Sequence, residues 1–276
     1  MTLSRNYMIT KRPSATNPYE ELENTGYFYG RPFYIDERVL IPRPETEQII
    51  EQVLNKLAPK GAEPQLTATR LSKDGERVSD ESRNDGHEER RGSNVVAEAP
   101  GVISILDLGT GSGAIAITLA LELPRAKITA SDISQDALAV AKINQEKLAP
   151  NSKIHFVQSD LLQNFCNKQS SSADAKFDII AANLPYVDKN WTWLDRAALA
   201  HEPEIALFAK DSGLELMKKL IRQAPDCLTE NGILILELDP CQAPHMKNYA
   251  NEHGFDIAHE RPFCLTLRQR NRKTAR

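Results

Sequence analysis

Residues 103–114 read ISILDLGTGSGA, and this stretch decides the fold. The apolar run 103–108 has the length and composition of a buried strand, and a helix is predicted over 112–123, ending at Pro124. The glycines between them let the backbone approach a ligand closely, and the first turn of the helix offers free N–H groups. A strand, a glycine-rich turn and a helix in this order are typical of the ligand-binding edge of a doubly wound sheet.

The same alternation of strands and helices continues toward the C-terminus. Further strands are predicted over 127–132, 153–160, 177–182 and 233–238, and helices over 134–148, 213–228 and about 240–252. A turn is expected at Asn231-Gly232, and strands 255–260 and 263–270 flank Arg261-Pro262 as a hairpin. Alternating strands and helices build a parallel sheet. The sequence therefore predicts an α/β fold with a doubly wound, mostly parallel, seven-stranded Rossmann-like sheet and an antiparallel C-terminal hairpin.

The region before residue 101 divides into three parts. Residues 27–41 are rich in aromatic and β-branched side chains around Gly30-Arg31-Pro32, which predicts a β-hairpin, and 44–57 carry an apolar helical face. Residues 59–100 contain 16 charged residues among 42 and no aromatic residue, so they are expected to be a disordered insert, with a docking tail as the alternative. The predicted organisation is a short N-terminal segment (1–58), the insert (59–100), one main domain (101–267) and a basic tail (268–276).

The composition excludes several classes of protein. The chain has 276 residues and a net charge of −4 from 34 basic and 38 acidic residues, which argues against a surface devoted to nucleic acid or anionic membrane. It has no apolar run of transmembrane length, and its first residues have no apolar stretch, so neither a membrane span nor a secretory leader is expected. The four cysteines form no Cys-x-x-Cys pair, so neither a zinc site nor a disulfide framework is expected. These features predict a cytoplasmic protein.

Acidic residues end the two strands that follow the glycine-rich turn. Asp132 stands about 20 residues beyond the glycines, where a carboxylate accepts hydrogen bonds from two ribose hydroxyls. Asp160 is suited to accept from the exocyclic amine of adenine, with Leu161 covering a ring face. Each acid alone could instead be a helix N-cap, and the turn also satisfies the dinucleotide pattern G-x-G-x-x-A. Together they favour S-adenosylmethionine, whose methionine part would be held by Gly109, Thr110, Gly111, Ser112 and Gly113.

The tetrapeptide Asn183-Leu184-Pro185-Tyr186 directly follows strand 177–182, at the same edge of the sheet. The Asn183 carboxamide is both donor and acceptor, Pro185 stiffens the turn, and Tyr186 offers a flat face. This combination suits a planar amide or the amine on a base edge, and Asn183 is also expected to contact the cofactor. The alternative is an ordinary Asn-x-Pro turn with a packed tyrosine.

With these motifs in place, the chain resembles the release factor glutamine methyltransferase family, which belongs to the class I S-adenosylmethionine-dependent enzymes. The matching pieces span 27–267 outside the insert: 36–47 (DERVLIPRPETE), 107–113, 131–134, 159–160, 183–186, 202–207, 211–214, 236–237 and Gln242. The resemblance implies methyl transfer to the side-chain nitrogen (N5) of a glutamine in the Gly-Gly-Gln motif of a peptide chain release factor, with S-adenosylhomocysteine as the other product. It also implies that Asn183 and the Leu184 carbonyl hold the amide, that Tyr186 packs on its plane, and that no metal is needed.

The chain departs from the family pattern at three places. Leu184 replaces the first proline of the usual Asn-Pro-Pro-Tyr, and Leu161 stands where an aromatic residue is frequent. Only 26 residues precede the predicted hairpin, where the family carries a helical domain thought to hold the protein substrate. Two alternatives therefore stay open. One is an adenine amino methyltransferase that acts on DNA or RNA, with the basic tail on phosphates. The other is a catalytically idle module that binds S-adenosylmethionine.

Overall fold

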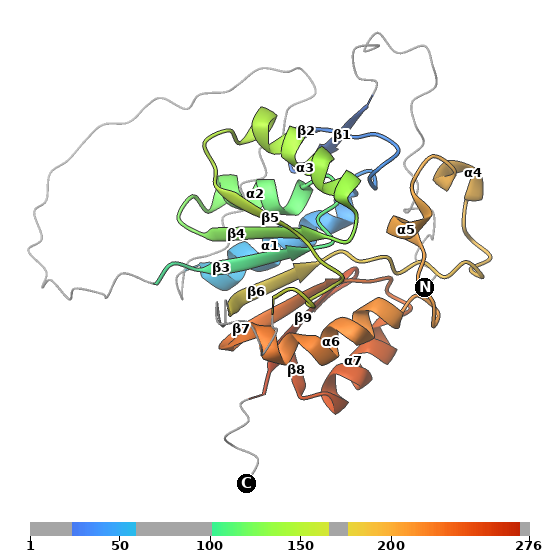
Figure 1. The fold of residues 1–276 in the computed structure, drawn as a ribbon. Coiled ribbons are helices and arrows are strands. Elements are labelled where there is room, and N and C mark those ends of the chain that lie inside the picture. The colour runs from blue at the N-terminus through green and yellow to red at the C-terminus, as the bar shows by residue number, and fades with distance from the viewer. Residues whose placement is uncertain (1–23, 59–100, 166–175, 271–276) are drawn as a thin grey trace, which may run out of the picture.

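The computed structural model describes residues 24–58, 101–165 and 176–270, which are drawn in colour in Figure 1. Seven of the described strands form one sheet in the order β5-β4-β3-β6-β7-β9-β8. Their bounds are β3 (Ser104–Leu108), β4 (Lys127–Asp132), β5 (Ile154–Gln158), β6 (Phe177–Ala182), β7 (Leu228–Glu237), β8 (Phe255–Arg261) and β9 (Cys264–Gln269). The first five are parallel, whereas β9 runs antiparallel to both β7 and β8. The predicted fold class is confirmed.

Helices cover both faces of this sheet because its central strands are apolar on both sides (Figure 1). The helices are α1 (Glu47–Leu57), α2 (Ala114–Glu122), α3 (Gln135–Leu148), α6 (Glu215–Cys227) and α7 (Ala243–Glu252). Alternate residues of one strand enter different cores: Ile105 joins the cluster beneath α1 and α2, and Leu106 joins the cluster beneath α6 and α7. Ser134 caps α3 as predicted, since its hydroxyl accepts from the Ala137 N–H at 3.2 Å.

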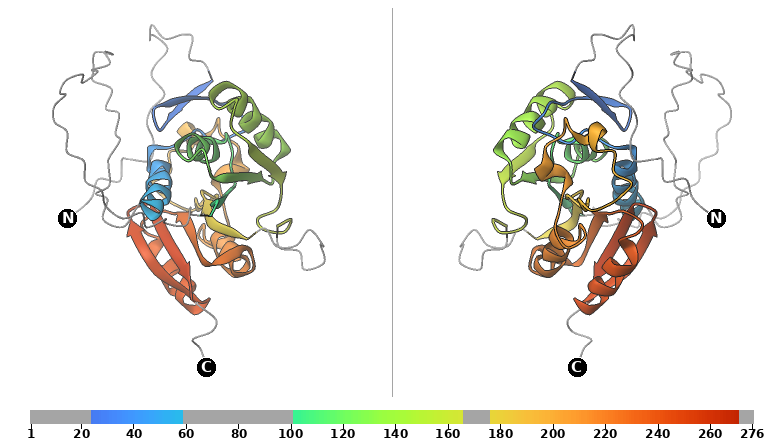
Figure 2. Two further views of the ribbon diagram at one scale, coloured as in Figure 1. Left: turned by 90° about the vertical axis from the view of Figure 1, so that its left-hand side faces the viewer. Right: turned by 90° about the vertical axis from the view of Figure 1, so that its right-hand side faces the viewer.

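A separate hairpin precedes the sheet. It consists of β1 (Thr25–Phe28) and β2 (Arg31–Tyr34), so it is shorter than predicted, and residues 35–43 continue as a loop into the short 3₁₀ helix η2 (Pro44–Thr46) and α1. Figure 2 shows the hairpin beside α3, at the opposite end of the molecule from β8. The buried Asn144 of α3 exchanges hydrogen bonds with both the N–H and the carbonyl of Tyr34, and also donates to the Ser112 carbonyl at 2.8 Å. One asparagine therefore joins the hairpin to the glycine-rich loop.

Two local expectations are wrong, and two short helices had not been predicted. Asn231-Gly232, where a turn was expected, lies within strand β7. In the pairing of β6 with β7, Phe177 is opposite Leu228 and Ile179 is opposite Ile233. The additional residues of β7 between these pairs are accommodated by a register shift. Two short helices, α4 (Arg196–Leu199) and α5 (Glu204–Leu207), follow β6 without having been predicted. Cys227 is disulfide-bonded, contrary to the expectation from cysteine spacing.

Several predictions fall outside the described part of the chain. The insert 59–100, the first 23 residues and the end of the basic tail (271–276) are among them, so the predicted domain organisation stays a prediction. Within the described ranges, no helix is both long and apolar enough to cross a membrane.

Candidate active site

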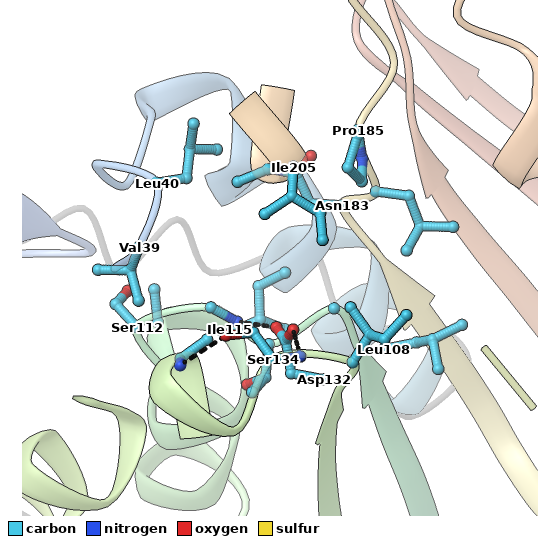
Figure 3. Close-up of a pocket in the computed structure, with 18 of the residues that line it drawn as sticks. Val39, Leu40, Leu108, Ser112, Ile115, Asp132, Ser134, Asn183, Pro185 and Ile205 are labelled. Carbon is cyan, nitrogen blue, oxygen red and sulfur yellow. Dashed lines mark hydrogen bonds between the residues drawn. The ribbon is translucent and has the colours of Figure 1, made fainter. Parts of the chain in front are cut away.

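A cavity of about 230 Å³ opens at the carboxyl ends of the parallel strands (Figure 3). Figure 3 shows Asp132 and Ser134 on one side of the cavity and Asn183, Pro185 and Ile205 on the other. The loops after β3, β4, β5 and β6 all contribute to its lining, and so do the loop before η2 and helix α5. Of the residues predicted for the site, it is lined by Gly109, Thr110, Gly111, Ser112, Asp132, Asp160, Leu161, Asn183, Leu184 and Pro185.

The glycine-rich loop is held by hydrogen bonds to the backbone of β4 and to the Asp132 side chain. The N–H groups of Gly109 and Thr110 both donate to the Ser131 carbonyl, at 2.8 and 2.9 Å, and the Gly111 N–H donates to Asp132. Gly109 and Gly111 have φ values of +75° and +55°, which favour glycine, and a Cβ on Gly111 would meet only open space. The loop thus presents bare backbone to the cavity.

Gly113 does not share this role. It is not among the described residues that line the cavity, and it caps α2 with φ +83°. A Cβ there would lie 2.9 Å from Ile117 Cδ1 and 3.2 Å from the Ala141 side chain. The absence of a side chain at Gly113 therefore serves the packing of α2 against α3 rather than contact with a ligand.

A buried carboxyl group, Asp107, supports the loop from behind. Its Oδ2 accepts from the Thr110 hydroxyl at 2.6 Å and from the Ala116 N–H at 3.0 Å. Burial raises the pKa of Asp107 to about 7, against the lowering effect of these two hydrogen bonds. Asp107 is fully buried and does not line the cavity among the described residues, so its role is to shape the loop.

Asp132 both organises the loop and faces the cavity. Its Oδ1 accepts from the Ser134 N–H and its Oδ2 from the Gly111 N–H, each at 2.9 Å. Burial raises the pKa of Asp132, and the backbone N–H donors oppose that rise. A carboxylate oxygen has room for a second hydrogen bond, so both oxygens keep acceptor capacity for a ligand.

Asp160 and Leu161 border the cavity from the loop after β5. Asp160 is exposed, and its Oδ2 accepts from Gln163 Nε2 at 2.9 Å. Leu161 is buried and has φ +49°, a left-handed conformation that is costly for a leucine. The Ser159 hydroxyl donates to the Leu161 carbonyl at 2.7 Å and secures this conformation. The strained backbone directs an apolar side chain to the cavity wall.

The tetrapeptide after β6 is fixed at several points. Asn183 Nδ2 donates to the Thr46 hydroxyl oxygen at 3.0 Å, so it is tied to η2. Leu184 is buried, with Cδ2 3.1 Å from the position of a Cβ on Gly109, and it belongs to the core cluster under α6 and α7. Leucine at 184 therefore fills core volume behind the loop. Pro185 lines the cavity.

Tyr186 differs from its predicted role. Its ring packs against the core under α6 and α7 and does not line the cavity among the described residues. The hydroxyl donates to Glu237 Oε1 at 3.1 Å, and the main-chain carbonyl accepts from Gln242 Nε2 at 2.8 Å. Burial, followed by the nearby Glu237 carboxyl, raises the pKa of Tyr186 well above its usual value. Tyr186 anchors the tetrapeptide instead of presenting a flat face to a ligand.

Sequence reasoning gave no role to the residues that support the tetrapeptide. Thr46, Glu237 and Gln242 all contact it, although they lie far from it in the chain. Glu202 accepts from the Arg43 guanidinium and from the Ile41 N–H, and this holds the loop before η2 against the segment that carries α5. The only signal for these residues was their presence in the motifs that match the family, which indicates importance but not contact.

The cavity fits the expected S-adenosylmethionine. The bare backbone at Gly111 leaves open space for a ligand, the Asp132 carboxylate retains acceptor capacity, and Leu161 provides an apolar surface for a ring. The Asp132 carboxylate is an acceptor, which suits a nucleoside whose ribose hydroxyls are free to donate.

Several known proteins are similar to this chain. Residues 102–261 match the family model of a methyltransferase domain. The chain is 35% identical over 244 residues to the release factor glutamine methyltransferase of Chlorobaculum tepidum, covering 87% of this chain and 69% of that relative. It is 33% identical to the enzyme of the same name from Lactococcus lactis, covering 83% of this chain and 67% of that relative. Among solved structures, the ribosomal protein L11 methylase from Lactobacillus delbrueckii is similar, with 23% sequence identity and a TM-score of 0.44. The match covers 63% of this chain and 72% of the methylase chain.

Proposed function

Because the chain belongs to the release factor glutamine methyltransferase family, we propose that it methylates the side-chain amide nitrogen of a glutamine in a peptide chain release factor. The observation that carries this proposal is the position of Asn183, a donor and acceptor for a planar amide, in the wall of the cavity that also contains the glycine-rich loop. The glutamine of a Gly-Gly-Gln motif is the proposed acceptor. Membership of this family disfavours adenine in DNA or RNA as the acceptor.

The methyl donor is S-adenosylmethionine, which supplies a methyl group already activated by its sulfonium. Asp132 would accept hydrogen bonds from the ribose hydroxyls, and Asp160 would accept from the adenine amine. Leu161 would cover a face of the adenine ring, and the loop from Gly109 to Ser112 would hold the methionine part. These assignments follow from the acceptors and apolar surface that line the cavity.

The remaining task of the protein is to position the acceptor amide. An amide nitrogen is a weak nucleophile because its lone pair is delocalised into the carbonyl. Asn183 and the Leu184 carbonyl would hold the –NH2 group with its lone pair toward the methyl. Positioning of this kind contributes about 7–11 kcal/mol in well-aligned reactions. As the new N–C bond forms, the S–CH3 bond of S-adenosylmethionine breaks, and S-adenosylhomocysteine leaves with the electron pair. The methylated nitrogen then gives up one N–H proton to water.

The decisive experiment incubates the full chain with S-adenosylmethionine and a purified release factor and locates the methyl group by mass spectrometry. One methyl on the glutamine of Gly-Gly-Gln is expected. Asn183→Ala should abolish the transfer while S-adenosylmethionine still binds. The control is Asn190→Ala, because Asn190 is exposed and its side chain, among the residues that the structure describes, bonds only to neighbouring Asp188. Methylation of nucleic acid instead, or cofactor binding without any turnover, would contradict the proposal.

A further inference from the structure

Most main-chain donors of the glycine-rich loop are already engaged within the protein. The N–H groups of Gly109 and Thr110 donate to one carbonyl of β4, and the Gly111 N–H donates to the Asp132 carboxylate. The Gly113 N–H donates to the Thr110 carbonyl at 2.8 Å. Each of these groups carries a single hydrogen, so all four are occupied before a ligand binds. The loop can surround the methionine part of S-adenosylmethionine, but most of its donors are lost to the carboxylate of that part.

The carboxylate is the one anionic group of S-adenosylmethionine. An anion that is bound away from water needs a cation or several N–H donors. Among the described residues that line the cavity, Arg38 is the only basic one. The acidic residues of this lining, Asp132 and Asp160, repel a carboxylate when they are ionised. Arg38 therefore supplies the charge that the glycine-rich loop lacks.

Arg38 lies between β2 and η2, in a loop that is joined to the Ser112 end of the glycine-rich loop. Asn144 Nδ2 donates to the carbonyls of both Ser112 and Tyr34, at 2.8 and 2.9 Å. Val39, which follows Arg38, belongs to a buried cluster with residues of α3, and Figure 3 shows it on the same side of the cavity as Ser112. These contacts hold the loop that carries Arg38 in place before a ligand binds.

Asp36 fixes the Arg38 guanidinium and leaves part of it available. Arg38 Nε donates to Asp36 Oδ1 at 2.9 Å and Nη2 donates to Oδ2 at 2.5 Å, whereas Nη1 has no hydrogen-bond partner within the described part of the chain. A guanidinium has five N–H donors, so three of them remain. Hydrogen bonding from Arg38 lowers the pKa of Asp36 to about 2, although burial opposes this, and both groups are charged at neutral pH. The Arg38 side chain is 32% exposed, so a ligand can reach it.

We propose that Arg38 binds the carboxylate of S-adenosylmethionine through the N–H groups that Asp36 leaves free. Asp36 is then a positioning residue, because its two oxygens fix the plane of the guanidinium. The inference rests on the methyl donor of the proposed function and not on its glutamine acceptor. It follows that the chain distinguishes adenosine compounds by the presence of a carboxylate, and this can be measured without a release factor.

Calorimetric titration of the full chain tests the contact with two ligands. S-adenosylmethionine and decarboxylated S-adenosylmethionine share the adenosine, the sulfonium and the amino group, and differ only in the carboxylate. The unmodified chain should bind S-adenosylmethionine about tenfold to a hundredfold more tightly, because hydrogen bonds between charged groups are among the strongest. Arg38→Gln should weaken this ligand by a similar factor and change the affinity for the decarboxylated compound by less than about twofold.

Two further variants and one control define the origin of the effect. Arg38→Gln leaves the Asp36 carboxylate without its partner, so the double variant Asp36→Asn/Arg38→Gln is measured beside it and should behave alike. Arg38→Lys keeps the charge without the planar fork and should lose less of the preference. The matched control is Arg31→Gln, because Arg31 is an arginine of β2 that pairs with Glu122 and does not line the cavity among the described residues. This control should bind both ligands as the unmodified chain does.

The outcomes separate this inference from the proposed function. Loss of the preference for the carboxylate in Arg38→Gln and in the double variant supports the contact, even if no release factor is methylated. An unchanged ratio of the two dissociation constants in these variants overturns it, even if a release factor is methylated. Equal weakening of both ligands also overturns it, because the cavity would then be damaged as a whole. Arg38→Lys keeps the test decisive if Arg38→Gln does not fold, since an unchanged ratio there is equally contradictory.

Discussion

Gly213 lies directly beneath the main chain of Tyr186, and its replacement tests how the tetrapeptide is supported. It has φ +82° and follows two further residues with positive φ, Asp211 and Ser212. A Cβ on Gly213 would lie 1.9 Å from the Tyr186 carbonyl oxygen and 2.5 Å from Gln242 Nε2. No rearrangement of a flexible side chain relieves the first contact, because the Tyr186 oxygen belongs to the backbone.

The cost of Gly213→Ala follows from three contributions. The left-handed backbone costs an alanine about 1–2 kcal/mol. Displacement of packed main chain costs about 1–3 kcal/mol. Gln242 Nε2 donates to the carbonyls of Tyr186 and Ser212, at 2.8 and 2.9 Å, and losing these bonds costs about 1 kcal/mol each. We expect the free energy of unfolding to fall by about 4–7 kcal/mol, with loss of methyl transfer because Tyr186 moves.

Urea unfolding of the full chain measures this cost, and Gly254→Ala is the matched control. Gly254 has φ +84°, but a Cβ there would have no neighbour within 4 Å, so this variant carries only the backbone contribution of about 1–2 kcal/mol. The difference between the two variants therefore isolates the contact with Tyr186 and Gln242. Equal destabilisation by both variants would refute the reasoning.

Three further predictions concern acidic residues. Asp132→Asn should weaken S-adenosylmethionine binding about tenfold to a hundredfold by calorimetry, because hydrogen bonds to a charged acceptor are lost; unchanged affinity would contradict the ribose contact. The pKa of Asp107 is raised from 3.8 to about 7 in the folded protein, so the free energy of unfolding should fall as the pH rises between these values. Asp107→Asn should reduce the dependence of this free energy on pH, measured by urea unfolding at several pH values. Glu202→Ala should lower the free energy of unfolding by about 3 kcal/mol, because it removes the ion-pair partner of Arg43. Glu204→Ala breaks an exposed pair with Lys189 and should cost under about 1 kcal/mol. Equal effects of the two variants would contradict this ranking.

Local pattern was sufficient for two strands of the parallel sheet. β4 and β6 have the predicted bounds, 127–132 and 177–182. Pattern failed at β7, where Asn231-Gly232 has the composition of a turn but continues a strand across a register shift. Pairing with β6 decides that boundary, and a single-strand pattern carries no information about the partner strand.

The sequence by itself determined which motifs lie together. Parallel strands bring their carboxyl ends to one edge, so the glycine-rich loop, Asp132, Leu161 and Asn183 were expected to meet, and all of them line one cavity. The residue types also indicated the chemistry, because carboxylates, glycines and a carboxamide keep their hydrogen-bonding capacity in any fold.

Only the tertiary structure decided which way each side chain faces. Tyr186 turns to Glu237 and the core instead of the cavity, and Gly113 packs two helices together. Asn183 is held by Thr46, 137 positions away in the chain. Such contacts arise from the packing of η2 against the sheet end, and no local periodicity records a hydrogen bond between segments that meet only after folding.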